Sequence, residues 1–198
     1  MITKHQLAIV LSKLKTFENP KPLLEQYSTD SNVAADILWN AFMIKDIEGK
    51  TIADLGAGTG ILGIGCLELG AKTVHFVEKD KDVIDQLNFN LSPYDENFKV
   101  INKDVNDFTK KVDVVVMNPP FGVQKRKADK IFVKKAIEIA ITSYYIGKVE
   151  SKKFIESICK DHNKKITHFW EYKLPLKKTM KFHTKSKQIV NVGCWRIK

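Results

Sequence analysis

Long apolar runs are missing from this chain of 198 residues. No run approaches the roughly 20 residues that a membrane-spanning helix needs. The start of the chain, MITKHQLAIVLSKLKTF, also lacks the apolar core and the cleavage signal of a secretory peptide. We therefore expect a cytoplasmic protein with no membrane partner.

Cysteine is scarce, since the chain holds three, Cys66, Cys159 and Cys194, and they lie far apart. An odd and widely spaced set fits neither a disulfide framework nor a zinc site. We expect buried free thiols and no bound metal. Internal repeats, low-complexity tracts and long Gly/Ser linkers are absent as well, so the sequence predicts a single domain.

Acidic residues become rare after residue 120. Residues 1–120 hold 13 Lys/Arg against 17 Asp/Glu, whereas residues 121–198 hold 20 against 6, and the net charge of the chain is +10. This asymmetry predicts a polyanionic partner, most simply nucleic acid, on the side built by the C-terminal part. A second interpretation stays open, because Arg126 and Arg196 are the two arginines and a lysine-rich surface can be merely solvated.

Segments of strand and helix character alternate along the chain, which predicts an α/β fold with a doubly wound, mostly parallel sheet. Strands are expected at 51–55, 73–78, 98–102, 112–117, 144–149, 166–172 and 188–197. Helices are expected at 3–17, from a cap at residues 29–31 through Ala41, and at 61–69, 80–90, 130–143 and 151–162. The last strands are closely spaced, so we expect antiparallel pairing there.

A glycine loop, DLGAGTG, follows the first strand and opens a helix. Gly56, Gly58 and Gly60 allow the backbone to pass close to a ligand without Cβ atoms in the way. The loop therefore predicts a cofactor site. GTGILG at 58–63 also matches the dinucleotide pattern G-x-G-x-x-G, so a nicotinamide or flavin remains an alternative.

Three carboxylates and a proline motif distinguish between these cofactors. Glu78 ends the second strand, 22 residues after Gly56, and suits the ribose hydroxyls of either ligand. Asp54 would repel a pyrophosphate but can pair with an ammonium group. Together with Asp104 after the third strand, where it can accept from an adenine amino group, and the NPPF segment after the fourth, this order favours S-adenosylmethionine.

The stretch VVVMNPPFG places Asn118 at the carboxyl end of a strand that is expected to be buried on both faces. Asn118 and the carbonyl of Pro119 can each accept one hydrogen of an exocyclic amine, which directs the nitrogen lone pair toward a methyl donor. Pro120 keeps the turn stiff, and Phe121 is expected to stack on an extruded base. These four residues are the predicted catalytic motif; the alternative is a structural Asx cap with a core aromatic.

In this order and spacing the motifs resemble class I methyltransferases that modify exocyclic amino groups. EQYST at 25–29, MNPPFG at 117–122 and MKFHTKS at 180–186 further resemble the methyltransferase-like protein five family, adenosine-N6 methyltransferases of small-subunit ribosomal RNA, and its archaeal relatives. The resemblance implies a Rossmann-like class I methyltransferase domain over 1–198. Residues 1–48 would form an N-terminal helical cap and cofactor lid, and residues 49–198 the core.

The resemblance also implies roles for single residues around S-adenosylmethionine. It places Gln26 and Thr29 over the cofactor, Gly56 and Thr59 beside its amino-acid part, Glu78 at the ribose, and Asp104 with Val105 at the adenine. Asp54, Gly58 and Gly60 complete the predicted cofactor site. Ser28 stands where family members usually have proline, which puts the rigidity of the lid in doubt.

Two basic segments are candidates for the RNA substrate. Lys125, Arg126 and Lys127 follow the catalytic motif and predict a substrate loop, although a solvated turn fits equally well. His183 lies in a basic, aromatic-flanked segment and is a weaker candidate for phosphate contact.

The third expected strand, 98–102, falls at the sheet edge in the usual methyltransferase strand order. Phe89, Leu91, Tyr94 and Phe98 could form an apolar patch there or pack under the helix at 80–90. The resemblance implies a small zinc-binding activator subunit that adds a strand to this edge. Other functions stay open: a methyltransferase of guanine N2, DNA adenine or protein glutamine, a nicotinamide-dependent oxidoreductase, or an inactive RNA-binding protein.

Overall fold

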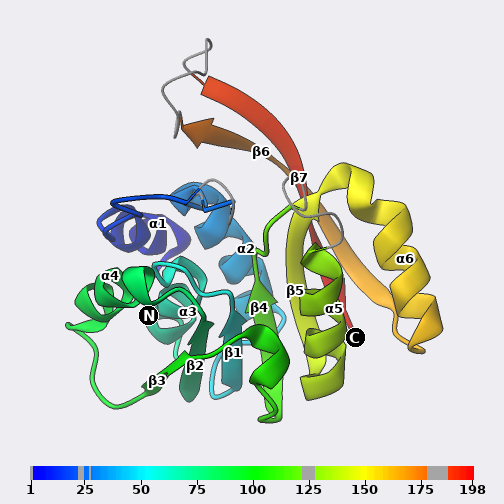
Figure 1. The fold of residues 1–198 in the computed structure, drawn as a ribbon, viewed down its shortest axis with the longest axis horizontal. Coiled ribbons are helices and arrows are strands. Elements are labelled where there is room, and N and C mark those ends of the chain that lie inside the picture. The colour runs from blue at the N-terminus through cyan, green and yellow to red at the C-terminus, as the bar shows by residue number, and fades with distance from the viewer. Residues whose placement is uncertain (1, 22–24, 27, 122–127, 178–186) are drawn as a thin grey trace.

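A computed structural model describes residues 2–21, 25–26, 28–121, 128–177 and 187–198. These residues form a seven-stranded sheet in the order β3-β2-β1-β4-β5-β7-β6, flanked by helices (Figure 1). The strands are β1 (Thr51–Leu55), β2 (Thr73–Glu78), β3 (Phe98–Asn102), β4 (Val112–Met117), β5 (Ala140–Lys148), β6 (Ile166–Lys177) and β7 (Lys187–Ile197). The helices are α1 (Lys4–Ser12), α2 (Ser31–Met43), α3 (Ile61–Glu68), α4 (Lys81–Leu91), α5 (Ala128–Ile139) and α6 (Lys152–Asp161), with single 3-10 turns η2 (Val105–Asp107) and η3 (Val149–Ser151).

The strand directions confirm the predicted fold class. Strands β1 to β5 pair in parallel, whereas β7 is antiparallel to both β5 and β6. The order reverses between β1 and β4, and in open α/β sheets such a switch point is where ligands bind, beyond the carboxyl ends of the strands.

Side chains of β4 alternate between two hydrophobic clusters, one on each face of the sheet. Val114 and Val116 pack with residues of α1, α2, α3 and α4, while Val115 and Met117 pack with residues of α5 and α6. Both faces of β4 are therefore buried, which explains its unbroken apolar run. The strand ends at Met117, and Asn118 follows it directly.

Some element boundaries differ from those expected. Helix α1 ends at Ser12, and α5 ends at Ile139, where β5 begins directly at Ala140 in register with Val112 of β4. The segment 140–143 was predicted as helix because its small and β-branched residues fit either element. Pairing with β4 decides the outcome, and Ile141 consequently points outward, 67% exposed.

The three cysteines are buried free thiols, as predicted. Trp195 is buried, while Trp39 and Trp170 are half-buried against the larger cluster. Among the described residues, no group of three or more His, Cys, Asp or Glu side chains could hold a metal ion, and none of the helices is long and apolar enough to cross a membrane.

Of the four apolar residues beside β3, Leu91, Tyr94 and Phe98 pack against the core, as the alternative expected, whereas Phe89 does not. Leu91 is buried, Phe98 packs edge-on against Phe76 with ring centroids 6.2 Å apart, and the Tyr94 hydroxyl donates to Glu68. Phe89 is exposed, and its ring lies under the ammonium group of Lys15. These side chains attach α4 and its following loop to the sheet.

A buried histidine in β2 predicts acid sensitivity. His75 is 1% exposed, and neither ring nitrogen has a hydrogen-bond partner within the described residues. Burial, followed by the charges of Lys110 and Lys99, lowers the pKa of His75 to about 4. An unfolded histidine binds a proton near pH 6.5, so stability is complete above that pH and is lost as pH falls toward 4.

We expect His75→Phe to reduce the loss of unfolding free energy between pH 7 and pH 4.5 by about 2 kcal/mol. Urea unfolding at both pH values measures this difference. His162→Phe, at an exposed position, is the matched control. An equal pH dependence in His75→Phe and the unsubstituted protein would contradict the assignment.

Candidate active site

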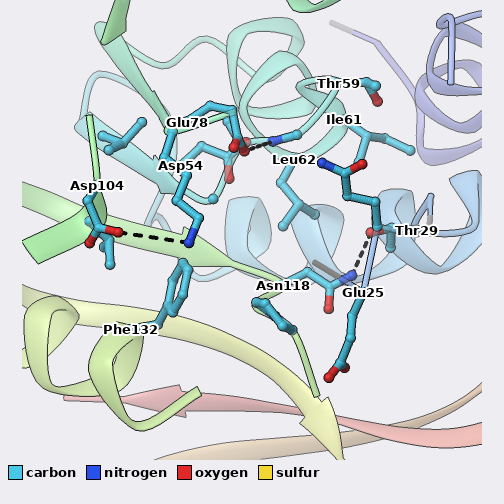
Figure 2. A pocket seen from close by; sticks show the side chains of 18 of the residues that line it. Glu25, Thr29, Asp54, Thr59, Ile61, Leu62, Glu78, Asp104, Asn118 and Phe132 are labelled. Carbon is cyan, nitrogen blue, oxygen red and sulfur yellow. Dashed lines mark hydrogen bonds and ion pairs between the residues drawn. The ribbon is translucent and has the colours of Figure 1, made fainter. Parts of the chain in front are cut away.

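A cavity of about 340 Å³ opens beyond the carboxyl ends of β1, β2, β3 and β4, at the switch point (Figure 2). Residues that follow each of these four strands line the cavity. The lining comprises Phe17, Glu25, Gln26, Ser28, Thr29, Asp54, Gly56, Ala57, Gly58, Thr59, Ile61, Leu62, Val77, Glu78, Lys79, Lys103, Asp104, Val105, Asn106, Asn118, Pro120, Ile131 and Phe132. The structure thus brings most of the predicted cofactor residues together with Asn118.

The glycine loop forms the floor of this cavity. The amides of Gly56 and Ala57 both donate to the carbonyl of Val77, at 2.9 and 3.1 Å, which holds the loop against the end of β2. Gly56 has φ +71°, and a Cβ there would lie 2.9 Å from the Phe132 ring. Gly58, with φ +54°, is covered in the same way by Phe17. Gly60 does not appear among the lining residues; its backbone begins α3.

Glu78 fixes the loop from the side. Its carboxylate accepts from the amide of Gly58 and from the amide of Asp80, both at 2.9 Å. A carboxylate has about four acceptor positions, so two backbone bonds leave capacity for ligand hydroxyls. The position of Glu78 in the cavity wall fits the ribose site that the sequence predicts.

Asp54 lies beneath the loop, 2% exposed, and accepts from the amide of Gly63 at 2.8 Å. Burial raises the pKa of its carboxyl to about 7; the Gly63 bond opposes this shift and the charge of Glu78 adds to it. Asp54 therefore ties the loop to the first turn of α3 and is poised to ionise near neutral pH.

The segment before α2 is anchored to the start of α4. The Gln26 amide donates to Asp80 at 2.7 Å and its oxygen accepts from the Lys21 amide at 2.8 Å, while the Lys21 ammonium group contacts Asp80 and Asp82. Burial would raise the pKa of Asp80, but the bonds from Lys21 and Gln26 outweigh it and the pKa is lowered. Side-chain contacts of Lys21 and Gln26 thus attach this segment to the start of α4.

The sequence did not single out Asp80, although an Asp directly before a helix signals an N-cap. It caps α4 and accepts from the amide of Asp82. Aromatic residues of the wall, Phe17 and Phe132, were also missed, because nothing in the local sequence distinguishes a wall residue from a core residue.

Asn118 and Thr29 face each other across the cavity wall, from the end of β4 and the segment before α2 (Figure 2). The Asn118 side-chain nitrogen donates to the Thr29 hydroxyl at 2.8 Å. Pro120 also lines the cavity, whereas Pro119 is buried. Phe121 does not appear in the lining; it is half-buried against the core with the Lys148 ammonium group 5.9 Å from its ring centre.

The adenine end of the predicted cofactor site is formed by the turn after β3. Asp104 accepts from the backbone and side-chain amides of Asn106 and lies 3.9 Å from the Lys79 ammonium group. Val105, buried, lines the cavity beside it. The predicted substrate residues Lys125, Arg126, Lys127 and His183 lie outside the described residues.

Comparison with known proteins identifies the family. Residues 27–142 match the methyltransferase small domain. The chain is 33% identical to the rRNA N(6)-adenosine-methyltransferase METTL5 of Danio rerio, over 94% of each chain, and 35% identical to protein MJ0284 of Methanocaldococcus jannaschii, over 100% of this chain and 94% of the other. The Drosophila melanogaster enzyme Mettl5 is 31% identical over 91% and 89%.

Solved structures agree with this result. The crystal structure of PH1948 from Pyrococcus horikoshii, described as a candidate RNA methyltransferase, has a TM-score of 0.94 and 46% identity over 100% of this chain and 98% of the other. Magnesium protoporphyrin IX methyltransferase of Synechocystis, solved with bound SAM, shares the fold at a TM-score of 0.66 and 12% identity over 84% and 78%. The chain therefore belongs to the methyltransferase small domain family, among the relatives of METTL5, and has the class I methyltransferase fold.

Proposed function

We propose that this protein transfers a methyl group from S-adenosylmethionine to N6 of adenosine in small-subunit ribosomal RNA. The observation that carries the proposal is the Asn118 amide, fixed by Thr29 in the wall of the cavity that holds the glycine loop and Glu78. Relatives that align over nearly their full length are named as ribosomal RNA N6-adenosine methyltransferases. A cytoplasmic location is part of the proposal.

The cavity fits S-adenosylmethionine. Glu78 would accept from the ribose hydroxyls, Asp104 and Val105 would border the adenine, and Asp54 with Gly56, Thr59 and Thr29 would border the amino-acid part. The bound cofactor supplies a methyl group on a positively charged sulfur. Asp54 can balance the ammonium group of such a ligand, directly or through water, whereas the pyrophosphate of a dinucleotide would be repelled there.

The proposed reaction requires no strong base from the protein. The adenine amine is a poor nucleophile because its lone pair is delocalised into the ring. The Asn118 oxygen and the Pro119 carbonyl would each accept one amine hydrogen, which turns the lone pair toward the methyl group. The proton leaves to solvent after transfer. Phe121 would stack on the extruded base, a role that requires the base to enter on the side of β5 where the ring lies.

Calorimetry separates this function from the nicotinamide alternative. The amide of Gly63, the last glycine of GTGILG, donates to buried Asp54. In this structure the last glycine of the pattern therefore binds a carboxylate of the protein itself. We expect S-adenosylmethionine to bind and NADH not to bind. For activity, labelled cofactor is offered with unmodified small-subunit ribosomal RNA, large-subunit RNA or protein, and transfer to the small-subunit RNA alone is expected; the same amount of label in any other substrate would contradict the proposal.

Protonation of Asp54 gives cofactor binding a pH dependence. Its carboxyl is protonated below a pKa of about 7, and a neutral carboxyl attracts an ammonium group less than a carboxylate does. We expect the affinity for S-adenosylmethionine to rise about tenfold between pH 5.5 and pH 7. When binding releases one proton from a carboxyl, the affinity can change by up to about tenfold per pH unit. Calorimetry at both pH values on Asp54→Asn should show a flat profile, while Asp85→Asn, at an exposed position, keeps the slope. A persisting slope in Asp54→Asn would contradict this role.

Strands β6 and β7 extend past the edge of the sheet at which the cavity opens. Beyond Lys148, the last residue of β5 in register with β7, residues 187–191 of β7 and 173–177 of β6 continue past the carboxyl edge of the sheet as a two-stranded ribbon (Figure 1). Residues 172–198 hold eight Lys/Arg and no Asp or Glu. This basic composition supports an RNA substrate.

Neutralising Lys125, Arg126 and Lys127 to Gln should weaken RNA binding and flatten its salt dependence. Each lost phosphate contact lowers the slope of log affinity against log salt by about 0.7 to 0.9. Fluorescence anisotropy across a salt series measures it. A control with Lys72, Lys110 and Lys160, exposed and away from the cavity lining, should keep the slope. Equal slopes for both triple variants would favour a solvated turn.

We further propose that a small zinc-binding activator subunit adds a strand to β3. Strand β3 is at the sheet edge and pairs with β2 within the described residues. Its side chains are at most half-buried. An unpaired strand edge is a template for another chain. Hydrogen exchange should show new protection of amides 98–102 in a complex with the activator; exchange unchanged there, despite complex formation, would place the subunit elsewhere.

A further inference from the structure

The contact between Thr29 and Asn118 joins two segments that are 89 positions apart in sequence. Thr29 is 6% exposed and directly precedes Asp30, whose side chain caps α2 by accepting from the amides of Asn32 and Val33. The first turn of α2 is therefore attached to the core immediately after Thr29, with Val33 and Ala34 both buried. The hydroxyl is held at a defined place beside the end of β4.

The Asn118 nitrogen faces Thr29, and this is the only hydrogen-bonded orientation of the pair once the Thr29 hydroxyl has donated its own hydrogen to another acceptor. A side-chain amide has a donating nitrogen and an accepting oxygen, and half a turn about its last bond exchanges them. The nitrogen donates to Thr29, and Figure 2 shows the oxygen on the side away from that hydroxyl. Only the oxygen can accept a hydrogen from an amine, so the reversed amide would present a donor to a donor.

The Thr29 hydroxyl has a second capacity. Its oxygen accepts from Asn118, and no acceptor among the described residues takes its own hydrogen, which a ligand can therefore accept, because a hydroxyl is both donor and acceptor. Thr29 lines the cavity, so that acceptor can be an oxygen of a ligand bound there, such as the carboxylate of an amino-acid group. One hydroxyl then contacts both the cofactor side and the acceptor of the target amine.

We propose that Thr29 is a positioning residue, which holds the Asn118 amide with its oxygen toward the target amine in addition to closing over the cofactor. This inference rests on the proposed amine methylation. It predicts that the threonine hydroxyl influences turnover at saturating cofactor and not only cofactor affinity, because the orientation of the acceptor matters in the step itself.

The test compares Thr29→Val, which keeps the shape but removes the hydroxyl, with Thr29→Ser, which keeps the hydroxyl. With saturating S-adenosylmethionine, Thr29→Val should lower kcat about 10- to 100-fold, as expected for a misoriented group. Thr29→Ser should restore kcat to within about threefold of the unsubstituted enzyme, since a serine hydroxyl can accept the same bond. Thr109→Val, at an exposed position outside the cavity lining, controls for threonine replacement in general.

A second readout does not depend on activity. In the cofactor-free protein, the Asn118 side-chain NH₂ should give one resolved pair of proton signals in NMR, which collapses or broadens in Thr29→Val and returns in Thr29→Ser. Thr29→Ala is the alternative if the valine variant does not fold. Each of three results would overturn the inference. The Asn118 NH₂ signals could be unchanged in Thr29→Val, kcat could fall equally in Thr29→Val and Thr29→Ser, or Thr29→Val could change only the KM for the cofactor. If the unsubstituted protein methylates no amine, the proposed function fails, and the NMR comparison still decides whether Thr29 orients the amide.

Discussion

Replacing Asn118 with alanine should lower methyl transfer at least about 1,000-fold while leaving the affinity for S-adenosylmethionine within about twofold. Asn118 would supply one of the two acceptors for the target amine, and its side-chain nitrogen donates to Thr29. Without that acceptor, the lone pair of the nitrogen stays delocalised into the π system of the ring. The cofactor site, formed by Glu78 and the loop, keeps its own hydrogen bonds.

Single-turnover transfer and calorimetry on the same preparation separate the two quantities. Asn32→Ala, an exposed asparagine in the first turn of α2, is the matched control and should keep full activity. Asn118→Asp keeps an acceptor oxygen but removes the side-chain N–H that donates to Thr29, because an ionised aspartate carries no donor. An Asn118→Ala enzyme with near-normal turnover would rule out the amine-acceptor mechanism.

Replacing Glu78 with alanine should have the opposite profile and weaken S-adenosylmethionine binding by about 1.5 to 3 kcal/mol, the range for hydrogen bonds to a charged group. The structure adds a reason beyond ribose contact. The same carboxylate holds the amides of Gly58 and Asp80, so its removal also loosens the glycine loop. Calorimetry measures the affinity directly.

The matched variant for this position is Glu78→Gln. Its amide can accept through one oxygen, so it should retain one of the two backbone bonds and lose less affinity than alanine. Asp85→Ala, which removes an exposed carboxylate on neighbouring α4, should leave binding unchanged. Normal cofactor affinity in Glu78→Ala would contradict both the ribose contact and the support of the glycine loop by Glu78.

Sequence reasoning succeeded where function is encoded in contiguous residues at the ends of strands. The turn from β1 into α3 needs glycine at positive φ, and β4 needs apolar residues on both faces followed by prolines. Such requirements are local, so they can be read without knowing the partners. The relative position of Glu78 and Gly58 also followed, because neighbouring parallel strands bring their carboxyl ends to one edge.

Contacts between distant segments could not be predicted in the same way. Nothing local to Gln26 indicates that its amide reaches Asp80, and the Thr29–Asn118 bond depends on how α2 packs on the sheet. The apolar residues near β3 show the same limit. Their composition fits an exposed patch or a packed helix equally well, and only the packing of Leu91 and Phe98 into the core decides between them.

Identification of the methylated nucleoside tests the central proposal most directly. The protein would be incubated with isotope-labelled S-adenosylmethionine and unmodified small-subunit ribosomal RNA, and the digested nucleosides would be resolved by mass spectrometry, with Asn118→Ala as the inactive control. The account predicts label in N6-methyladenosine, at a single position, and none with the variant. Label in N2-methylguanosine, or none in RNA from an enzyme that binds the cofactor, would contradict it.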